Sequence, residues 1–180
     1  MSVLKTVTKL LIVLILPVIA ACNQSYELDS DIVDQAQVLN LATPEQKVLI
    51  SGQPTEEQFR LLADAGVRHV INLRPADEQD WDEGALVQSL DMEYYSIPVA
   101  GAAGVTLENA QSLYQLLAQL EGEPLIVHCA SGNRVGALVA FSSMEFDGLG
   151  IEGAIAEGQR WGLTGMEPAV REILSPNFGK

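Results

Sequence analysis

The stretch PLIVHCASGNRVGAL, residues 124–138, contains the features that decide the fold. Its first part, Pro124–His128, is an apolar run of the length of a buried strand, and Arg134–Phe146 is largely apolar with the length of a helix. The residues between them, 129–133, are mostly small, so we expect a tight turn. Gly132 allows a backbone conformation that a side chain would obstruct. The stretch therefore predicts a strand, a turn and a helix in immediate succession.

Short β-branched runs and helical periods alternate on both sides of this stretch. The expected strands are Val48–Ser51, Val67–Leu73, Tyr94–Val99 and Pro124–His128. The expected helices start at the capping box Thr55–Gln58, at about Trp81, at Thr106, at Arg134, at about Ile151 and at Glu167. This alternation predicts an α/β fold with a mostly parallel central sheet and helices on both faces. Ligands of such sheets bind beyond the carboxyl ends of the strands, which is where Cys129 follows its strand.

The first 21 residues have the order of an export signal. Lys5 and Lys9 precede an apolar run from Leu10 to Ile19, and small residues follow. The run is short for a membrane-spanning helix, which needs about 20 apolar residues. A plain N-terminal membrane anchor is the alternative. The end of the segment, residues 19–22 (IAAC), resembles the lipobox of bacterial lipoproteins, and the resemblance implies cleavage before a lipid-modified Cys22.

This resemblance implies an exported protein that its lipid holds to a bacterial membrane, facing the periplasm. Asn23, where Asp would follow in inner-membrane lipoproteins, favours the outer membrane. The next residues are polar and acidic, as in a spacer. We therefore expect a signal peptide at 1–21, the lipidated cysteine and spacer at 22–40, and one α/β domain at 41–180.

The chain is strongly acidic, with a formal net charge of −14. Removal of the signal deletes two lysines and no acids, which leaves 8 basic and 24 acidic residues and a net charge of −16. Such a surface repels nucleic acid, so we expect no nucleic-acid partner. An anionic substrate must then be captured by a local positive potential.

The cysteine count singles out Cys129. The chain has two cysteines, and if Cys22 is acylated, no internal disulfide can form. A lone thiol in an oxidising compartment is a liability unless it is used. The alternative is a buried structural cysteine, because cysteine also packs as a small hydrophobe.

The turn after Cys129 has the parts of an anion site. A helix that begins near Arg134 leaves unpaired N–H groups pointing into the loop, so the amides of Ala130, Ser131, Gly132, Asn133 and Arg134 form a cradle. The same field favours the thiolate of Cys129, and His128 and Arg134 add to it. Arg134 also supplies a bidentate fork for tetrahedral oxyanions. Nucleophile, cradle and clamp thus lie within six residues, and we predict covalent chemistry at Cys129.

The motif HCASGNR, residues 128–134, resembles the signature of cysteine-dependent phosphatases. Together with SGQPTEEQFRLLADAGVRHVINLRP (51–75), YYSIPV (94–99) and PLIVHCASGNRVGAL, it is similar to the phosphatase-like domain of beta-lactamase-hydrolase-like proteins, which has the dual-specificity tyrosine phosphatase fold. The resemblance covers about Val48 to Phe146. It implies Cys129 as nucleophile, Arg134 as phosphate clamp and the amides of residues 130–134 as cradle. The implied activity is hydrolysis of a phosphorylated small molecule or protein through a phosphocysteine.

Three departures from the phosphatase pattern leave other functions open. Only four residues separate Cys129 from Arg134, where phosphatases have five and rhodanese-type sulfurtransferases have four. Val135 stands where Ser or Thr usually assists the thiolate as leaving group. The loop Ala100–Gly104, where an Asp acts as general acid in the family, has no acid. A general acid contributes about 10²–10⁴-fold, so we expect slow hydrolysis of alkyl phosphates and a smaller loss for aryl phosphates.

Other polar and aromatic residues have a less specific pattern. The acids of the loop after Leu73 can replace the missing general acid, but we favour a solvated acidic loop; they are Glu78, Asp80, Asp82 and Glu83. Arg74 fits an anion contact or a surface ion pair equally well. His69, Trp81 and Trp161 are expected to pack. No cluster has metal-ligand spacing and no nucleotide-binding glycine motif is present, so we expect no metal and no cofactor.

The residues thus leave three functions, in order of preference. The first is a cysteine-dependent phosphatase, and the second is a sulfurtransferase that works through a persulfide of Cys129. The third is an anion-binding module without catalysis.

Overall fold

The computed structural model describes residues 27–175 of the chain. The predicted signal peptide and Cys22 lie outside the described residues. In this part of the chain, no helix is both long enough and apolar enough to cross a membrane.

Five strands form one sheet in the order β1-β2-β5-β3-β4. β1 pairs antiparallel with β2, and the other pairs are parallel. The strands are β1 (Ala42–Glu45), β2 (Val48–Ser51), β3 (His69–Asn72), β4 (Glu93–Ser96) and β5 (Leu125–His128). The prediction of an α/β fold with a mostly parallel sheet is confirmed.

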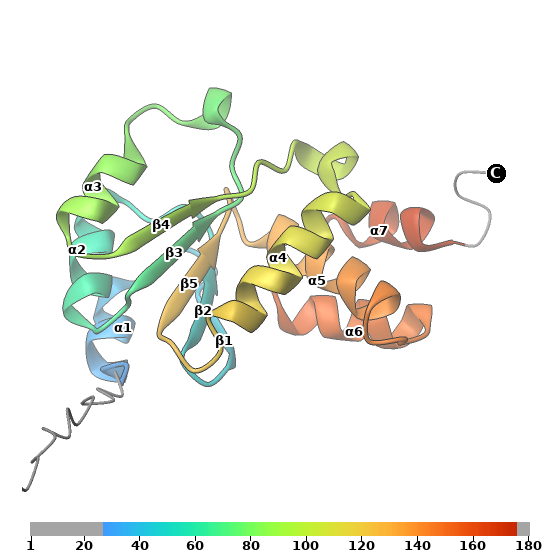
Figure 1. The fold of residues 1–180 in the computed structure, drawn as a ribbon, viewed down its shortest axis with the longest axis horizontal. Coiled ribbons are helices and arrows are strands. Elements are labelled where there is room, and N and C mark those ends of the chain that lie inside the picture. Colours follow the sequence, from blue (N-terminus) through green and yellow to red (C-terminus); the bar gives the residue numbers. More distant parts are fainter. Residues whose placement is uncertain (1–26, 176–180) are drawn as a thin grey trace, which may run out of the picture.

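Helices cover both faces of the sheet, as expected (Figure 1). The α-helices are α1 (Ser30–Ala36), α2 (Glu56–Asp64), α3 (Glu83–Ser89), α4 (Leu107–Gln119), α5 (Asn133–Glu145), α6 (Ile151–Arg160) and α7 (Glu167–Leu174). In Figure 1, α1–α3 lie on one side of the sheet and α4–α7 on the other. Each face of the sheet has its own apolar core. Successive side chains of β5 point to opposite faces, so Ile126 packs toward α2, whereas Val127 and Cys129 pack toward α5.

The central strand β5 brings three strand ends together. All four of its residues are buried, and its last residue, His128, is in register with Ser51 of β2 and Asn72 of β3. The carboxyl ends of the three parallel strands therefore meet at one edge of the sheet. Cys129 leaves the sheet at this edge, in the position where parallel sheets bind ligands.

Two elements lie where the sequence indicated none. α1 falls within the stretch 22–40 that we expected to be a spacer, yet Val33, Ala36 and Val38 are buried against α2. The N–H of Asp29 also donates to the carbonyl of Ala65, at 2.8 Å. The boundary at residue 41 is therefore corrected, because packed structure begins before it. The apolar positions of α1 are too few to reveal a helix until α2 covers them.

β1 was missed for a different reason. It is an edge strand of composition ATPE whose residues are mostly exposed, so it has no apolar pattern of its own. The predicted strands Val67–Leu73 and Tyr94–Val99 are also shorter in the structure, where β3 and β4 have four residues each.

Candidate active site

Cys129 lies at the bottom of the turn between β5 and α5. Its side chain is buried, with the residue 1% exposed. The N–H of Gly132 donates to Sγ of Cys129 at 3.1 Å. Gly132 has φ +87°, a left-handed conformation that glycine adopts without strain, and it is the N-cap of α5. The turn therefore points a backbone donor at the sulfur, as the sequence predicted.

Side chains from distant parts of the chain hold this turn. The amide of Asn40 donates to the carbonyl of Ser131 at 3.0 Å. The side-chain oxygen of Asn133 accepts from the N–H groups of Thr164 and Met166 at 2.8 and 3.2 Å. These contacts join residues that are far apart in sequence. No signal in the sequence identified Asn40 or Thr164 as supports of the turn.

Arg134 is buried beside the thiol, and two other loops fix its side chain. Nη1 donates to the carbonyl of Val99 at 2.8 Å and to Glu78 Oε1 at 3.0 Å, and Nη2 donates to Glu78 Oε2 at 2.6 Å. Burial opposes the charge of Arg134, but the hydrogen bonds that Arg134 donates to Glu78 and the attraction of Cys129 and Glu78 outweigh it and raise the pKa of Arg134. The guanidinium is therefore charged and held in one orientation.

Glu78 is not part of a solvated acidic loop, which corrects our interpretation of that residue. Its hydrogen bond with Arg134 lowers the pKa of the Glu78 carboxyl against a smaller opposing effect of burial, and both Arg134 and Arg74 attract its charge. Arg74 also donates to the backbone carbonyl of Glu78. Of the two roles considered for Arg74, an anion contact or an ion pair, the structure shows the ion pair, and its partner is Glu78. A carboxyl with a lowered pKa is ionised at neutral pH and cannot donate a proton there.

Glu83 is also buried, and it pairs with His128. Nε2 of His128 lies 2.9 Å from Oε1 of Glu83, and both side chains are almost fully buried. Burial raises the pKa of Glu83, but the hydrogen bond and charge of His128 and the hydrogen bond of Gln53 outweigh it, so the pKa is lowered. The amide of Asn72 donates to the same carboxylate at 2.8 Å. Glu83 is therefore a structural anion within the core.

The side chain of His128 lies on the opposite face of the sheet from Cys129. Its ring packs edge-on against Phe59, with 5.7 Å between the ring centres. Among the described residues, no hydrogen bond joins His128 to Cys129. A direct catalytic contact is therefore not seen, and any role of His128 is that of a positioning residue at the end of β5.

The remaining candidates are exposed or in packing positions. Asp80 and Asp82 are exposed, and Asp82 caps α3 by accepting from the N–H of Ala85 at 2.9 Å. Trp161 is buried, and Trp81 packs edge-on against Phe59.

His69 lies beside Glu93, with Nδ1 3.6 Å from Oε2. No group of three or more His, Cys, Asp or Glu side chains within residues 27–175 converges to hold a metal ion.

The loop Gly101–Gly104, a short 3-10 helix, has no side chain that can donate a proton. Val135, the first residue after Arg134, is fully buried. Both departures from the phosphatase pattern therefore remain in the folded molecule. The arrangement can bind a tetrahedral anion next to a sulfur nucleophile, and the loop Gly101–Gly104 supplies no proton donor for the leaving group.

The sequence of the chain is similar to those of known proteins. The family model for DSP-PTPase phosphatase fused to NAD⁺ kinase matches residues 22–146. A beta-lactamase hydrolase-like protein of Xylella fastidiosa (strain Temecula1) is 34% identical over 104 residues, which are 55% of this chain and 24% of that protein. The chain thus spans about a quarter of the length of the curated relatives it matches.

Solved structures of phosphatases share the fold. A putative phosphatase (DUF442) from Shewanella putrefaciens CN-32 superposes with a TM-score of 0.63 at 26% identity, and the match covers 84% of this chain and 100% of that one. The catalytic domain of the PP-IP phosphatase Siw14 from S. cerevisiae has a TM-score of 0.58 at 14% identity, with 78% and 88% covered. At that identity the likeness shows the fold alone.

Proposed function

The chain belongs to the family described as DSP-PTPase phosphatase fused to NAD⁺ kinase, and on this basis we propose that it is a cysteine-dependent phosphatase that hydrolyses phosphomonoesters. The observation that supports the proposal best is the pairing of a buried sulfur with a fixed guanidinium. Sγ of Cys129 accepts from Gly132, while Glu78 and Val99 orient Arg134 beside it. The guanidinium of Arg134 and the N–H of Gly132 attract an anion, and the sulfur of Cys129 can attack it.

The proposed reaction has two steps. The thiolate of Cys129 attacks phosphorus, a S–P bond forms, and the P–O bond to the leaving alcohol or phenol breaks. Water then attacks the phosphocysteine and releases inorganic phosphate and the thiolate. Arg134 and the N–H groups at the start of α5 bind the phosphoryl oxygens in both steps. The proton for the leaving group comes from solvent, which favours aryl over alkyl esters because phenolates are better leaving groups.

Phosphate release from 4-nitrophenyl phosphate by the full chain tests this proposal. We expect turnover by the wild type, none by Cys129→Ser, and a phosphorylated cysteine after rapid acid quench of the wild type. Cys129→Ser preserves the size of the side chain and removes the thiolate, so it is the matched control. Equal release by wild type and variant would reject the proposal.

Sulfur transfer is a second candidate because four residues separate Cys129 from Arg134, as in rhodanese-type enzymes. The thiolate would attack the outer sulfur of thiosulfate, release sulfite and form a persulfide, and cyanide would remove that sulfur as thiocyanate. The same two proteins, assayed for thiocyanate in parallel, separate the candidates. Turnover of thiosulfate without turnover of aryl phosphate selects sulfur transfer, and binding of vanadate without either activity selects an anion-binding module.

We also propose that lipid on Cys22 holds the protein to the membrane, on the periplasmic side. The support is the IAAC sequence behind a basic and apolar segment. Labelling of the protein with a radioactive fatty acid tests it. Label that is present in the wild type and absent from Cys22→Ser is expected, and label retained by Cys22→Ser would contradict it.

A further inference from the structure

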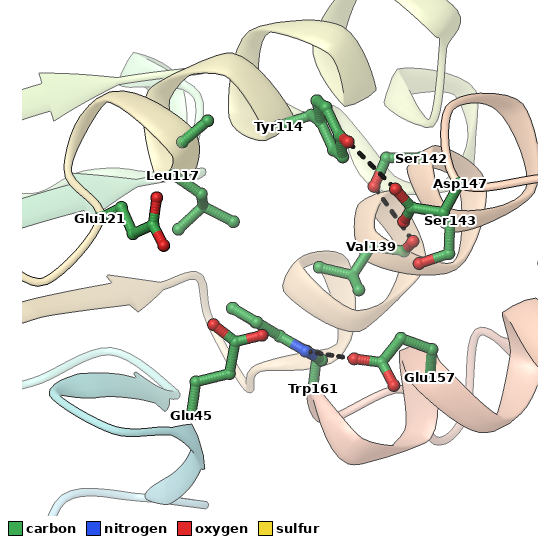
Figure 2. A pocket seen from close by; sticks show the side chains of 11 residues that line it. Glu45, Tyr114, Leu117, Glu121, Val139, Ser142, Ser143, Asp147, Glu157 and Trp161 are labelled. Atoms are coloured by element: carbon green, nitrogen blue, oxygen red, sulfur yellow. Dashed lines mark hydrogen bonds between the residues drawn. The ribbon is translucent and has the colours of Figure 1, made fainter.

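A cavity lies at the opposite end of the parallel strands from Cys129. It has a volume of about 280 Å³ and is lined by residues of α4, α5, α6 and the edge strand β1 (Figure 2). Glu45 closes β1 next to the start of β2, and Glu121 lies in the turn just before β5. Both residues are therefore at the amino ends of the parallel strands, whereas Cys129 is at the carboxyl end of β5.

Among the residues that the structure describes, four carboxylates and no basic side chain line the cavity. Figure 2 shows Glu45 and Glu121 on one side and Asp147 and Glu157 on the other. The side chains of Glu45 and Glu121 have no hydrogen-bond or ion-pair partner among the described residues. Asp147 accepts from the hydroxyl of Tyr114 at 3.0 Å, and Glu157 accepts from Trp161 at 2.9 Å and pairs with Arg160. The cavity thus has unbalanced negative charge.

Ser143 provides a second and independent indication of a ligand. The residue is 3% exposed, and its hydroxyl points into the cavity in Figure 2. The hydroxyl of its neighbour Ser142 donates to the carbonyl of Val139 at 3.1 Å. The backbone carbonyl of Ser143 accepts from the N–H of Leu149 at 3.1 Å, but the hydroxyl of Ser143 makes no hydrogen bond within residues 27–175. The hydroxyl is open to the cavity and is not one of the fully enclosed side-chain atoms that lack a partner, so its hydrogen bond is left to whatever occupies the cavity. A ligand donor in the cavity would supply one.

The walls between the two charged sides are apolar. Leu117, Val139 and the indole of Trp161 separate Glu45 and Glu121 from Asp147 and Glu157. The carboxylates do not converge into a group that could hold a metal ion. A ligand that matches this pattern has positive charge at both ends and an apolar middle. The face of Trp161 also favours an alkylammonium group.

From this pattern we propose that the cavity is a binding site for a small aliphatic diamine, with one ammonium group between Glu45 and Glu121 and the other near Asp147 and Ser143. The site is separate from Cys129, so binding does not require the thiol. α5 begins at the turn that carries Arg134 and contributes Val139 and Ser143 to the cavity, so one rigid element connects the two places.

Titration calorimetry of the full chain with 1,4-diaminobutane tests the proposal. We expect saturable binding at one site, at least about ten-fold weaker binding of 1-aminobutane, and no binding of 1,4-butanediol. Each comparison keeps the apolar middle and changes the charge. Binding by Cys129→Ser is expected to equal that of the wild type. Equal affinity for the monoamine and the diamine would overturn the proposal.

Variants of the lining residues locate the site. Glu45→Gln with Glu121→Gln is expected to weaken diamine binding at least about ten-fold. Glu108→Gln with Glu172→Gln removes the same number of charges from exposed positions outside the cavity, and we expect it to change the affinity less than about two-fold. Ser143→Ala removes the unpartnered hydroxyl, which predicts a loss of about two- to ten-fold.

Circular dichroism melts show whether these variants fold. Ala118 is an exposed α4 residue that lines the cavity. Ala118→Trp fills the cavity without removing charge, and we expect it to abolish binding. This variant replaces the double glutamine variant if the latter does not fold. Unchanged affinity in Ala118→Trp, or equal losses in the two double variants, means that the diamine associates with the acidic surface in general, and the site is then rejected.

Discussion

Arg134 carries its charge in a buried position because three oxygen atoms of two residues compensate for lost water. Glu78 approaches the guanidinium with both carboxylate oxygens, and the carbonyl of Val99 accepts a further hydrogen bond. The bidentate contact with Glu78 uses Nη1 and Nη2. This arrangement orients Arg134 before any substrate binds, and such preorganisation is the main contribution that a charged clamp makes to catalysis.

Glu78→Gln tests whether this residue positions Arg134 or donates a proton. Because the pKa of Glu78 is lowered by Arg134, we expect a positioning role. The variant should then lose about ten-fold in kcat/KM against an aryl and an alkyl phosphate by the same factor. A general acid would show a much larger loss for the alkyl ester, whose leaving group needs the proton. Steady-state assays with 4-nitrophenyl phosphate and a glycerol phosphate distinguish the two outcomes.

Glu83 and His128 form a buried pair whose contribution to the free energy of unfolding depends on pH. The pKa of Glu83 lies below its ordinary value of 4.5. The folded state therefore binds a proton at Glu83 less readily than the unfolded state does. The stabilisation is fully present above pH 4.5 and is lost as the pH falls through the lowered pKa.

Urea unfolding of wild type and Glu83→Gln at several pH values measures this contribution. At pH 7 the variant should be less stable by about 2–3 kcal/mol, because His128 loses a buried anionic partner. Below pH 4.5 the wild type should lose stability faster than the variant. Asp80→Asn, at an exposed position, is the control and should stay within about 0.5 kcal/mol of wild type. Parallel pH curves for wild type and Glu83→Gln would contradict the argument.

At the scale of elements, α5 connects the candidate active site to the core. Its N-cap, Gly132, donates to the sulfur of Cys129, and the α5 residues Arg134–Ala140 are all buried. The approach of α6 is close because glycine faces it: a Cβ on Gly136 would lie 2.2 Å from the N of Leu163 and 2.4 Å from the carbonyl oxygen of Gly158. The position of α5, and with it the turn, depends on this contact.

Gly136→Ala should therefore destabilise the protein by at least about 3 kcal/mol, since backbone atoms cannot yield as side chains do. Gly153→Ala in α6 is the matched control, because its Cβ would meet only the side chain of Leu149 at 3.6 Å or more. That variant should gain about 0.5–1 kcal/mol from helix propensity. Thermal unfolding measures both changes, and equal melting temperatures for the two variants would refute the packing argument.

At the scale of the whole molecule, the acidic surface opposes an anionic substrate. The chain has a net charge of −14, while the guanidinium of Arg134 and the N–H of Gly132 at the start of α5 supply local attraction next to Cys129. Attraction at the turn acts over a short range, and repulsion by the surface acts over a longer one. Salt screens the longer-range effect more strongly.

We therefore expect kcat/KM for an anionic aryl phosphate to rise by about three-fold between about 10 mM and about 150 mM NaCl. A phosphotyrosyl peptide flanked by lysines should show the opposite trend, because the same surface attracts it. Stopped-flow or steady-state rates at constant pH provide the measurement. A fall in kcat/KM with salt for the anionic substrate would mean that local charges dominate the approach.

The local pattern was sufficient for much of the fold. The capping box at Thr55 and Gln58 is present in the structure, and α7 begins at the predicted residue, Glu167. The turn from β5 through Gly132 to α5 was also predicted, because strand, glycine and helix follow each other within a few residues. Such features depend on neighbours in sequence, whose chemistry can be read directly.

The sequence by itself therefore determined the α/β class, the parallel sheet and the placement of Cys129 and Arg134 on one turn. Only the tertiary structure decided that Glu78 orients Arg134, that Glu83 pairs with His128 across 45 positions, and that α1 packs on α2. The physical reason is that a carboxylate in a polar loop looks the same in sequence whether water or a buried cation solvates it. The difference arises when distant segments exclude water together.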